Sequence, residues 1–248
     1  MRTIFINGSP KKRFCASSYF LFLQRLFVGG EKVNEHLRTK GDYQRILDRL
    51  PGADAVVFGL PLYVDGVPSH VLGFLEEMER FCKEKALRPK VYVIANNGFI
   101  EGKQNEPLMR VMEHFCQRAG LTWGGGVGIG GGVMLNVTRI LFFVQAGLLV
   151  LNLLLSGVQT GNFLPTASLY SFLKNVAWLL YFNLGALIFL ARMGGYIRRG
   201  GFAGKKYTRI LVPSFVFILF ADAFFLIVSV LEGGVFRGWL ARKTAEEE

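Results

Sequence analysis

Hydroxyl and basic side chains gather near the start of the chain, between a short strand pattern and a helix pattern. Thr3–Ile6 is a β-branched and aromatic run, and the turn signal Asn-Gly-Ser-Pro follows it directly. Ser9, Lys11, Ser17 and Ser18 lie where the helix is expected to begin. Backbone N–H groups at a helix N-terminus favour anions, so this loop predicts a phosphate site. The alternative is an ordinary capped turn with solvated basic residues.

Two later loops carry groups that suit a flat ring. Pro61-Leu62-Tyr63-Val64 offers an aromatic side chain that can lie against a planar ligand. Asn96-Asn97-Gly98-Phe99 offers amides and bare backbone, which can hydrogen-bond the edge of a heterocycle. The alternative for each is a turn without a ligand.

The elements around these loops alternate between strand and helix patterns along residues 1–135. Apolar runs predict strands at 3–6, 55–59, 91–95 and from 121, and the short polar segment 32–37 is a weak strand pattern. Helical spacing predicts helices at 17–27, 42–50, 69–84 and 106–119. Since parallel strands need crossover helices, the expected fold is an α/β, doubly wound, five-stranded parallel sheet. Such sheets bind ligands beyond the carboxyl ends of their strands, so all three loops should meet at one site.

At this level of detail the first half resembles a known family. The stretches INGSPKKRFCASSYFL, FGLPLYVDGVPSHVLGFLEEM and NNGFIEGKQNEPLMRVMEHFCQRAGLTWGGG resemble the flavodoxin-like NAD(P)H-dependent FMN reductases and quinone reductases. The resemblance covers roughly residues 1–132, and it departs from the family where Phe14-Cys15-Ala16 replaces small residues. It implies one set of cofactor-binding residues: Ser9, Lys11, Ser17 and Ser18 for the FMN phosphate, and Pro61, Leu62, Tyr63, Val64, Asn96, Asn97, Gly98 and Phe99 for the flavin ring.

The resemblance also implies an activity. It predicts an oxidoreductase that passes electrons from NADH or NADPH through FMN to a quinone or another small acceptor, and a homodimer as the assembly. It identifies no catalytic acid or base. The alternative hypothesis is a flavin-based redox sensor or membrane interaction module without significant turnover, because a fold alone does not specify an enzyme.

The second half has a different composition. Three segments, Asn136–Ser156, Tyr170–Ala191 and Ile210–Leu231, are apolar nearly all round and about as long as a bilayer core requires. The sequence therefore predicts two domains, a cofactor domain at 1–135 and an all-α transmembrane domain at 136–248. The alternative is a buried helical subdomain.

Charges between the spans predict an orientation. No charged residue lies in Val158–Leu169, whereas Arg192–Arg209 holds six Lys and Arg residues. By the positive-inside rule the basic loop is cytoplasmic, which leaves the cofactor domain in the cytoplasm and the tail from Glu232 outside. Because this tail holds Arg237, Arg242 and Lys243, the alternative is a third segment that enters the membrane without crossing it. Asp222 lies in the middle of the third span and is expected to face other helices rather than lipid.

The remaining signals exclude other classes. The chain has 3 Cys and none forms a C-x-x-C pair, so a zinc knuckle, a disulfide framework or an iron–sulfur cluster is not expected, and no metal site is predicted. The net charge of +11 forms no basic stripe interleaved with aromatic residues, which argues against nucleic acid. Gly126–Gly131 matches G-x-G-x-x-G without the required context and is interpreted as a flexible exit from the last strand. Cys15 is interpreted as a small filler residue.

Overall fold

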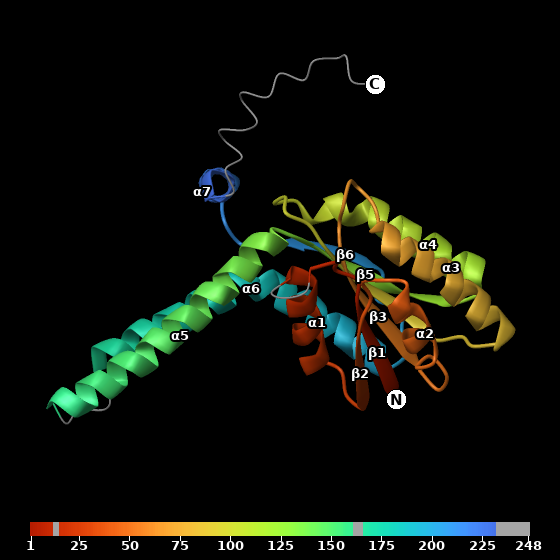
Figure 1. Cartoon of the computed structure of the whole chain (residues 1–248), viewed down its shortest axis with the longest axis horizontal. Coiled ribbons are helices and arrows are strands. Elements are labelled where there is room, and N and C mark those ends of the chain that lie inside the picture. The colour runs from red at the N-terminus through yellow and green to blue at the C-terminus, as the bar shows by residue number, and fades with distance from the viewer. Residues whose placement is uncertain (12–14, 161–165, 232–248) are drawn as a thin grey trace, which may run out of the picture. The chain divides into compact units, whose positions relative to one another are not determined.

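The computed structural model describes residues 1–11, 15–160 and 166–231 (Figure 1). Contacts divide the chain into two units, Met1–Leu211 and Val212–Glu248. The first unit contains the sheet and two long apolar helices. The described part of the second unit is essentially one helix, α7 (Ser214–Leu231).

The described residues form one six-stranded sheet in the order β2-β1-β3-β4-β5-β6, with every neighbouring pair parallel. The strands are β1 (Arg2–Asn7), β2 (Glu31–His36), β3 (Ala55–Pro61), β4 (Lys90–Asn96), β5 (Thr122–Gly130) and β6 (Lys205–Arg209). The predicted α/β doubly wound parallel sheet is confirmed, and its first five strands have the flavodoxin-like order 2-1-3-4-5. The predicted number of strands was one too few.

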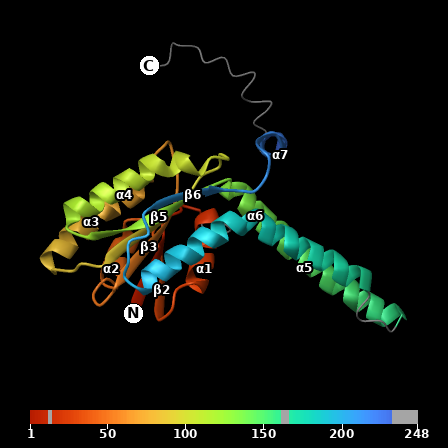
Figure 2. The ribbon, with the colours of Figure 1, turned by 180° about the vertical axis from the view of Figure 1, so that it is seen from behind.

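Helices cover both faces of the sheet (Figures 1 and 2). One face carries α2 (Gly41–Leu47), α3 (Ser69–Glu84) and α4 (Glu106–Ala119), whose apolar stripes form the main core with the strands. That core includes Phe58, Phe74, Met78 and Met112, all fully buried. The other face is covered by α1 (Ala16–Leu26) and by the second half of α6 (Thr166–Arg198). A short 3₁₀ helix, η1 (Gly102–Asn105), precedes α4.

The extra strand, β6, comes from the basic loop between the second and third predicted spans. Its sequence, KKYTR, has no apolar run that would predict a strand. Side-chain contacts with α4 hold it at the sheet edge: Tyr207 donates to Glu106, and the Lys205 ammonium lies 2.7 Å from Glu113. The hydrogen bond from Tyr207 is the main cause of the lowered pKa of Glu106. The hydrogen bond from Lys205 to Glu113 is the main cause of the raised pKa of Lys205. Both ionised forms are therefore stabilised by the docking of β6.

The glycine run predicted as a flexible exit is instead the body of β5, so that interpretation was wrong. A Cβ on Gly126 would lie 2.7 Å from the Val93 carbonyl oxygen, and one on Gly128 would lie 2.7 Å from the Tyr207 ring. Glycine is needed within this strand because neighbouring backbone and β6 approach it too closely for a side chain.

Gly130→Ala should destabilise the fold for this reason. Its Cβ would meet the Ile100 carbonyl oxygen and lie 2.6 Å from the Gly102 nitrogen, and overpacking of this kind costs about 1–3 kcal/mol. Thermal unfolding of the detergent-solubilised protein should show a midpoint several degrees lower, at about 2–4 °C per kcal/mol. Gly29→Ala is the matched control, because no heavy atom lies within 4 Å of its Cβ. Equal midpoints for the two variants would refute the packing of β5.

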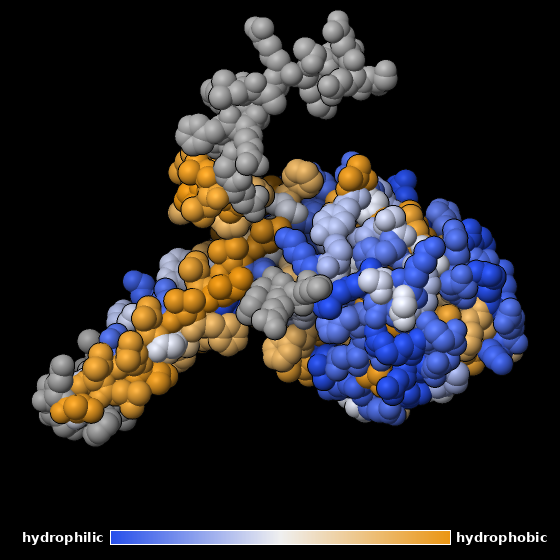
Figure 3. Space-filling view, viewed as in Figure 1, coloured by the Kyte–Doolittle hydropathy of each residue, from blue (hydrophilic) through white to orange (hydrophobic). Residues whose placement is uncertain are grey.

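The two long helices α5 (Gly132–Thr160) and α6 run side by side and antiparallel (Figures 1 and 2). Their apolar side chains face outward along most of this pair, as the orange surface in Figure 3 shows. Gly132–Val158, Ser168–Arg198 and Ser214–Leu231 are each long and apolar enough to cross a membrane by length and composition. Only 6% of the best window in the first and third is buried inside the protein.

The second half of α6 differs from the first. Ala186, Leu190, Met193 and Ile197 are fully buried at helical spacing, because this half packs on α1, β5 and β6. The part of α6 whose apolar side chains are left exposed is therefore shorter than the predicted span Tyr170–Ala191. α7 begins at Ser214 rather than at Ile210, directly after Pro213. The tail predicted to lie outside the cell, from Glu232, is beyond the described residues.

The position of β6 has a topological consequence. α5 leaves the sheet after β5, α6 returns to it, and β6 then pairs with β5. The basic segment after α6 and the predicted cofactor domain therefore lie in the same compartment. This holds whether or not α5 and α6 cross a membrane.

Candidate functional site

The three loops singled out in the sequence meet in one cleft at the carboxyl ends of β1, β3 and β4. The cleft has a volume of about 120 Å³ and lies where the strand order reverses between β1 and β3, the usual ligand position in this topology. It is lined by Ser9, Lys11, Cys15, Ala16, Ser17, Pro61, Leu62, Tyr63, Asn96, Asn97, Gly98, Val133 and Asn136. Nine of these are predicted residues.

The first loop is held by hydrogen bonds to the end of β1. The Ser9 backbone N–H donates to Asn7 Oδ1 at 3.0 Å, and the Lys11 N–H donates to Ser9 Oγ at 3.4 Å. Gly8 before them lies close to two side chains, since a Cβ there would lie 2.5 Å from Leu60 Cδ2 and 2.9 Å from Val71 Cγ2. The turn is therefore fixed close to β3, with the exposed Lys11 at its outer end.

Ser17 joins the first loop to the third. Its buried hydroxyl oxygen accepts a hydrogen bond from Asn96 Nδ2 at 2.9 Å. Since a hydroxyl has one donor and two acceptor sites, the Ser17 proton remains available to a group in the cleft. Asn96 Nδ2 also donates to the Leu60 carbonyl, so its orientation is fixed by β3 as well.

Asn97 supplies a polar atom without a partner. Its backbone carbonyl accepts from Gly132, its N–H donates to Ile129, and its Nδ2 donates to the Glu101 carbonyl. Its Oδ1 is buried and, among the described residues, has no hydrogen-bond partner. A buried acceptor in this condition is costly, and a ligand N–H in the cleft would satisfy it.

The second loop forms the outer wall. The Leu62 N–H donates to the Asn96 carbonyl at 2.8 Å, which ties this loop to the third. Tyr63 is 40% exposed and pairs with Gly66 through two backbone hydrogen bonds. An aromatic ring at the rim, held by a tight turn, can cover a flat ligand.

Three predicted residues do not line the cleft. Val64 and Phe99 lie in the right loops but expose their side chains. The Ser18 hydroxyl donates to the Cys15 carbonyl at 2.8 Å, and its side chain lines a neighbouring cavity instead. Their proposed contacts with a cofactor therefore stay predictions.

Four lining residues were missed by the sequence reasoning. Cys15 and Ala16 form the start of α1, and helical phase around Ser17 could have indicated them. Val133 and Asn136 belong to the first turns of α5. Val133 was expected at the end of the cofactor domain without a role, and Asn136 at the start of the first predicted span. The cofactor cleft and the first apolar helix thus share residues.

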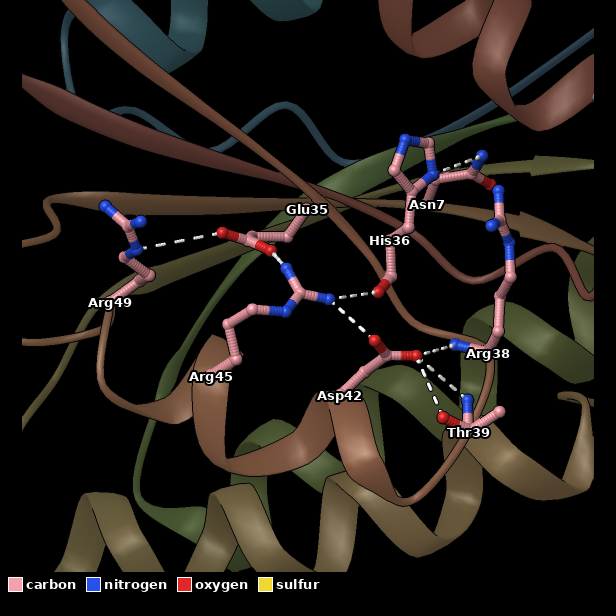
Figure 4. A network of polar contacts seen from close by, with 8 residues as sticks. All are labelled: Asn7, Glu35, His36, Arg38, Thr39, Asp42, Arg45 and Arg49. Carbon is pink, nitrogen blue, oxygen red and sulfur yellow. Dashed lines mark hydrogen bonds and ion pairs between the residues drawn. The ribbon is translucent and has the colours of Figure 1, made fainter. Parts of the chain in front are cut away.

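A polar network at the end of β2 supports the first loop (Figure 4). Buried Glu35 pairs with Arg45 and Arg49 from α2 and the residues after it. His36 Nδ1 lies 3.4 Å from Asn7 Nδ2, which also donates to Cys15 Sγ at 3.4 Å. Burial, with Arg38 nearby, lowers the pKa of His36. A neutral ring nitrogen can then accept from Asn7.

Cys15 differs from the other two cysteines. Burial raises its pKa, but hydrogen bonds with Ser18, Asn7 and Ser9 outweigh burial and leave the pKa of Cys15 below its ordinary value. Burial raises the pKa of Cys82 to about 11 and that of Cys116 to about 12. Cys15 thus has more thiolate character than a filler residue would.

Iodoacetamide should therefore modify Cys15 first. At pH 7.5 we expect its alkylation, followed by peptide mass spectrometry, to proceed at least about tenfold faster than at Cys82 or Cys116, because only the thiolate reacts. The rate should rise with pH and level off below the usual thiol range. Equal rates at Cys15 and Cys82 in the folded protein would contradict the cleft geometry.

No group of three His, Cys, Asp or Glu side chains that could hold a metal occurs in residues 1–11, 15–160 and 166–231.

The solved structures that resemble this chain cover about half of it. No protein-family model matches the chain, and no curated protein does either. Solved structures that resemble it include the Trp repressor binding protein from Bacillus subtilis (20% identity, TM-score 0.43, 52% of this chain and 85% of that one). Another is the NAD(P)H:quinone oxidoreductase from Methanothermobacter marburgensis (16% identity, TM-score 0.43, 56% of this chain and 92% of that one). A third is an FMN-dependent NADH-azoreductase from Bacillus anthracis in complex with FMN (14% identity, TM-score 0.35, 49% of this chain and 83% of that one).

Proposed function

We propose that the protein is a membrane-anchored, FMN-dependent NAD(P)H oxidoreductase that reduces a quinone or another small acceptor. The observation that carries this proposal is the cleft itself. Three separate loops, each with groups suited to part of a flavin nucleotide, converge at the strand-order reversal where flavodoxin-like sheets bind FMN.

The start of α1 suits the FMN phosphate. α1 has no acidic residue in its first turn, and Cys15 at its N-cap makes no side-chain capping hydrogen bond among the described residues. The Ser17 hydroxyl, the Ser9 turn and the Lys11 ammonium would supply the donors and the charge that a phosphate needs.

The second and third loops suit the ring system. Asn97 Oδ1 would accept a ring N–H, and Tyr63 with Leu62 and Pro61 would cover one side. Gly98 leaves open backbone where the ring edge would lie, because a Cβ there would contact only Val133 at 3.7 Å. Val64 and Phe99 would need to turn inward to contribute.

Bound FMN would supply two-electron chemistry by accepting hydride from NADH or NADPH and passing the electrons on. The residues of the chain would bind and orient it. The helix dipole and Lys11 would neutralise the phosphate, and the Asn97 amide would fix the ring in its plane. No acid or base in the cleft is required, and we assign none.

The apolar helices would anchor the flavin domain to a bilayer. α5 and α7 have the length and composition of spans, and the first half of α6 also carries exposed apolar side chains, among them Leu173, Trp178 and Leu180. The basic segment after α6 is on the same side as the sheet. If α5 and α6 cross a bilayer, the positive-inside rule would put the flavin domain in the cytoplasm, where reduced nicotinamide cofactors are available. A homodimer stays a prediction.

Steady-state kinetics test the proposal. Detergent-purified protein with FMN should oxidise NADH or NADPH continuously when a quinone is added. Bound FMN without turnover, together with a co-purifying partner, would instead favour the redox sensor or membrane interaction module. If the protein neither bound FMN nor oxidised NADH or NADPH, the hypothesis of a flavoprotein would be refuted.

A further inference from the structure

A second cavity lies where α1, α5 and α6 converge. It has a volume of about 370 Å³ and is lined mainly by aromatic and aliphatic side chains. α1 contributes Tyr19, Phe22 and Leu23, α5 contributes Arg139, Phe142 and Phe143, and α6 contributes Leu179, Leu180, Asn183 and Leu187. Phe22, Phe143 and Leu180 are more than half exposed and form its rim, whereas Tyr19 and Leu23 are buried.

The polar groups of this cavity lie together on one side. Tyr19 donates to Asn183 Oδ1 at 3.0 Å, and Asn183 Nδ2 donates to the Leu179 carbonyl. The Arg139 guanidinium lies over the Tyr19 ring, 4.9 Å from its centroid, and forms no ion pair within the described ranges. Its N–H donors are therefore available to an oxygen of a ligand.

The cavity and the cofactor cleft are lined by nearby residues of the same two helices. On α1 the cleft is lined by Ala16 and Ser17 and the cavity by Tyr19; on α5 the cleft is lined by Asn136 and the cavity by Arg139. Three helical residues correspond to a rise of about 4.5 Å. A ligand in the cavity would thus have its polar end less than one helical turn from the cleft and its apolar part against the helices that carry the exposed apolar surface (Figure 3).

We propose that this cavity binds the head and first tail segment of a long-tailed, membrane-soluble quinone, which is the electron acceptor. The inference rests on the proposed function. Apolar walls suit an isoprenoid tail that arrives from the lipid, and Arg139 would donate to a quinone carbonyl at the end facing the cleft. A water-soluble acceptor would need neither the cavity nor its position at the base of the α5–α6 pair.

The chemistry balances. The quinone takes up two electrons and two protons and leaves as the quinol. NADH or NADPH loses a hydride, which supplies both electrons and one proton, and is released as NAD⁺ or NADP⁺. The second proton comes from water.

A matched pair of variants tests the site. Leu180→Trp places a large side chain at the cavity rim. Leu173→Trp places the same side chain on the same helix, at a position that lines neither this cavity nor the cofactor cleft; Leu180 and Leu173 are 54% and 56% exposed. Each variant receives one quinone ring in two forms, with a long isoprenoid tail and without a tail. For Leu180→Trp we expect the KM of the tailed quinone to rise at least about tenfold, with flavin content and turnover of the tailless quinone unchanged. Leu173→Trp should match the unmodified protein.

Photolabelling gives a readout independent of turnover. A photoreactive long-tailed quinone should crosslink to peptides 19–23, 139–143 or 179–187, and unlabelled tailed quinone should compete while the tailless form competes weakly. Crosslinks elsewhere, or equal KM values for the tailed quinone in both Trp variants, would overturn the inference. The proposed function would still stand if the protein continued to reduce the tailless quinone. Competition by phospholipid as strong as by tailed quinone would identify a lipid site and would also overturn it. If the unmodified protein reduced neither quinone, the proposed function would be refuted instead.

Discussion

Replacing Ser17 by alanine should weaken FMN binding by about tenfold to a hundredfold. Ser17 is buried at the start of α1, and its oxygen already accepts from Asn96, so its proton is the one that would donate to the phosphate. A hydrogen bond to a charged group contributes about 1.5–3 kcal/mol, which corresponds to that loss in affinity. Fluorescence quenching during titration of the flavin-free protein measures the dissociation constant.

Ser18→Ala is the control for this substitution. The two serines are adjacent in one helix turn, but the Ser18 hydroxyl donates to the Cys15 carbonyl and its side chain lines another cavity. Its removal should change FMN affinity by less than about threefold, since a neutral local hydrogen bond contributes only about 0.5–1.5 kcal/mol, and to the fold rather than to the ligand. An equal loss in both variants, or none in Ser17→Ala, would place the phosphate elsewhere.

Cysteine labelling in intact cells should divide the chain between two compartments in an all-or-none manner. On a background without the native cysteines, Cys at Gln104 and Cys at Phe202 should react with a membrane-impermeant reagent only after lysis. Cys at Thr166 should react before lysis, because the six basic residues of 192–209 hold their end of the hairpin inside. Phe202 serves as the labelling position in this loop since it is 62% exposed, whereas neighbouring Ala203 is buried.

The pairing of β6 with β5 makes one part of this result independent of charge. Gln104 and Phe202 must share a compartment, because β6 belongs to the same sheet as the cofactor cleft. Opposite labelling of these two positions would refute the fold at that edge. Labelling of Gln104 from outside would separate the flavin domain from cytoplasmic NADH and NADPH and would refute the reductase. Protection of Thr166 in intact cells would mean that the hairpin enters the bilayer without crossing it.

Local patterns were sufficient for the first five strands and their helices. Val91–Ala95 and Ala55–Gly59 are apolar on both faces, as central parallel strands must be, and α3 and α4 carry regular apolar stripes. The convergence of the three loops followed from topology alone, since the carboxyl ends of parallel strands share one edge. Nine of the twelve predicted cofactor residues accordingly line one cleft.

The features that sequence reasoning missed depend on contacts between distant segments. β6 is polar and is held by Glu106 and Glu113, about a hundred residues away. The sequence of the second half of α6 resembles a membrane span because the helix is apolar along its whole length. Its first half exposes apolar side chains, whereas its second half buries them against the sheet. Val133 and Asn136 line the cleft only because α5 begins directly against Asn97. The Ser18 side chain faces a different cavity from Ser17 because the start of α1 fixes its helical phase.

The central claim, that the cleft binds FMN, is tested most directly by the visible absorption spectrum of the detergent-purified protein. The protein is incubated with FMN, separated from free cofactor by gel filtration, and then given NADH or NADPH without oxygen. We predict flavin absorbance that elutes with the protein in about equimolar amount and bleaches when the nicotinamide cofactor is added. A colourless protein that remains colourless after incubation with FMN would contradict the account.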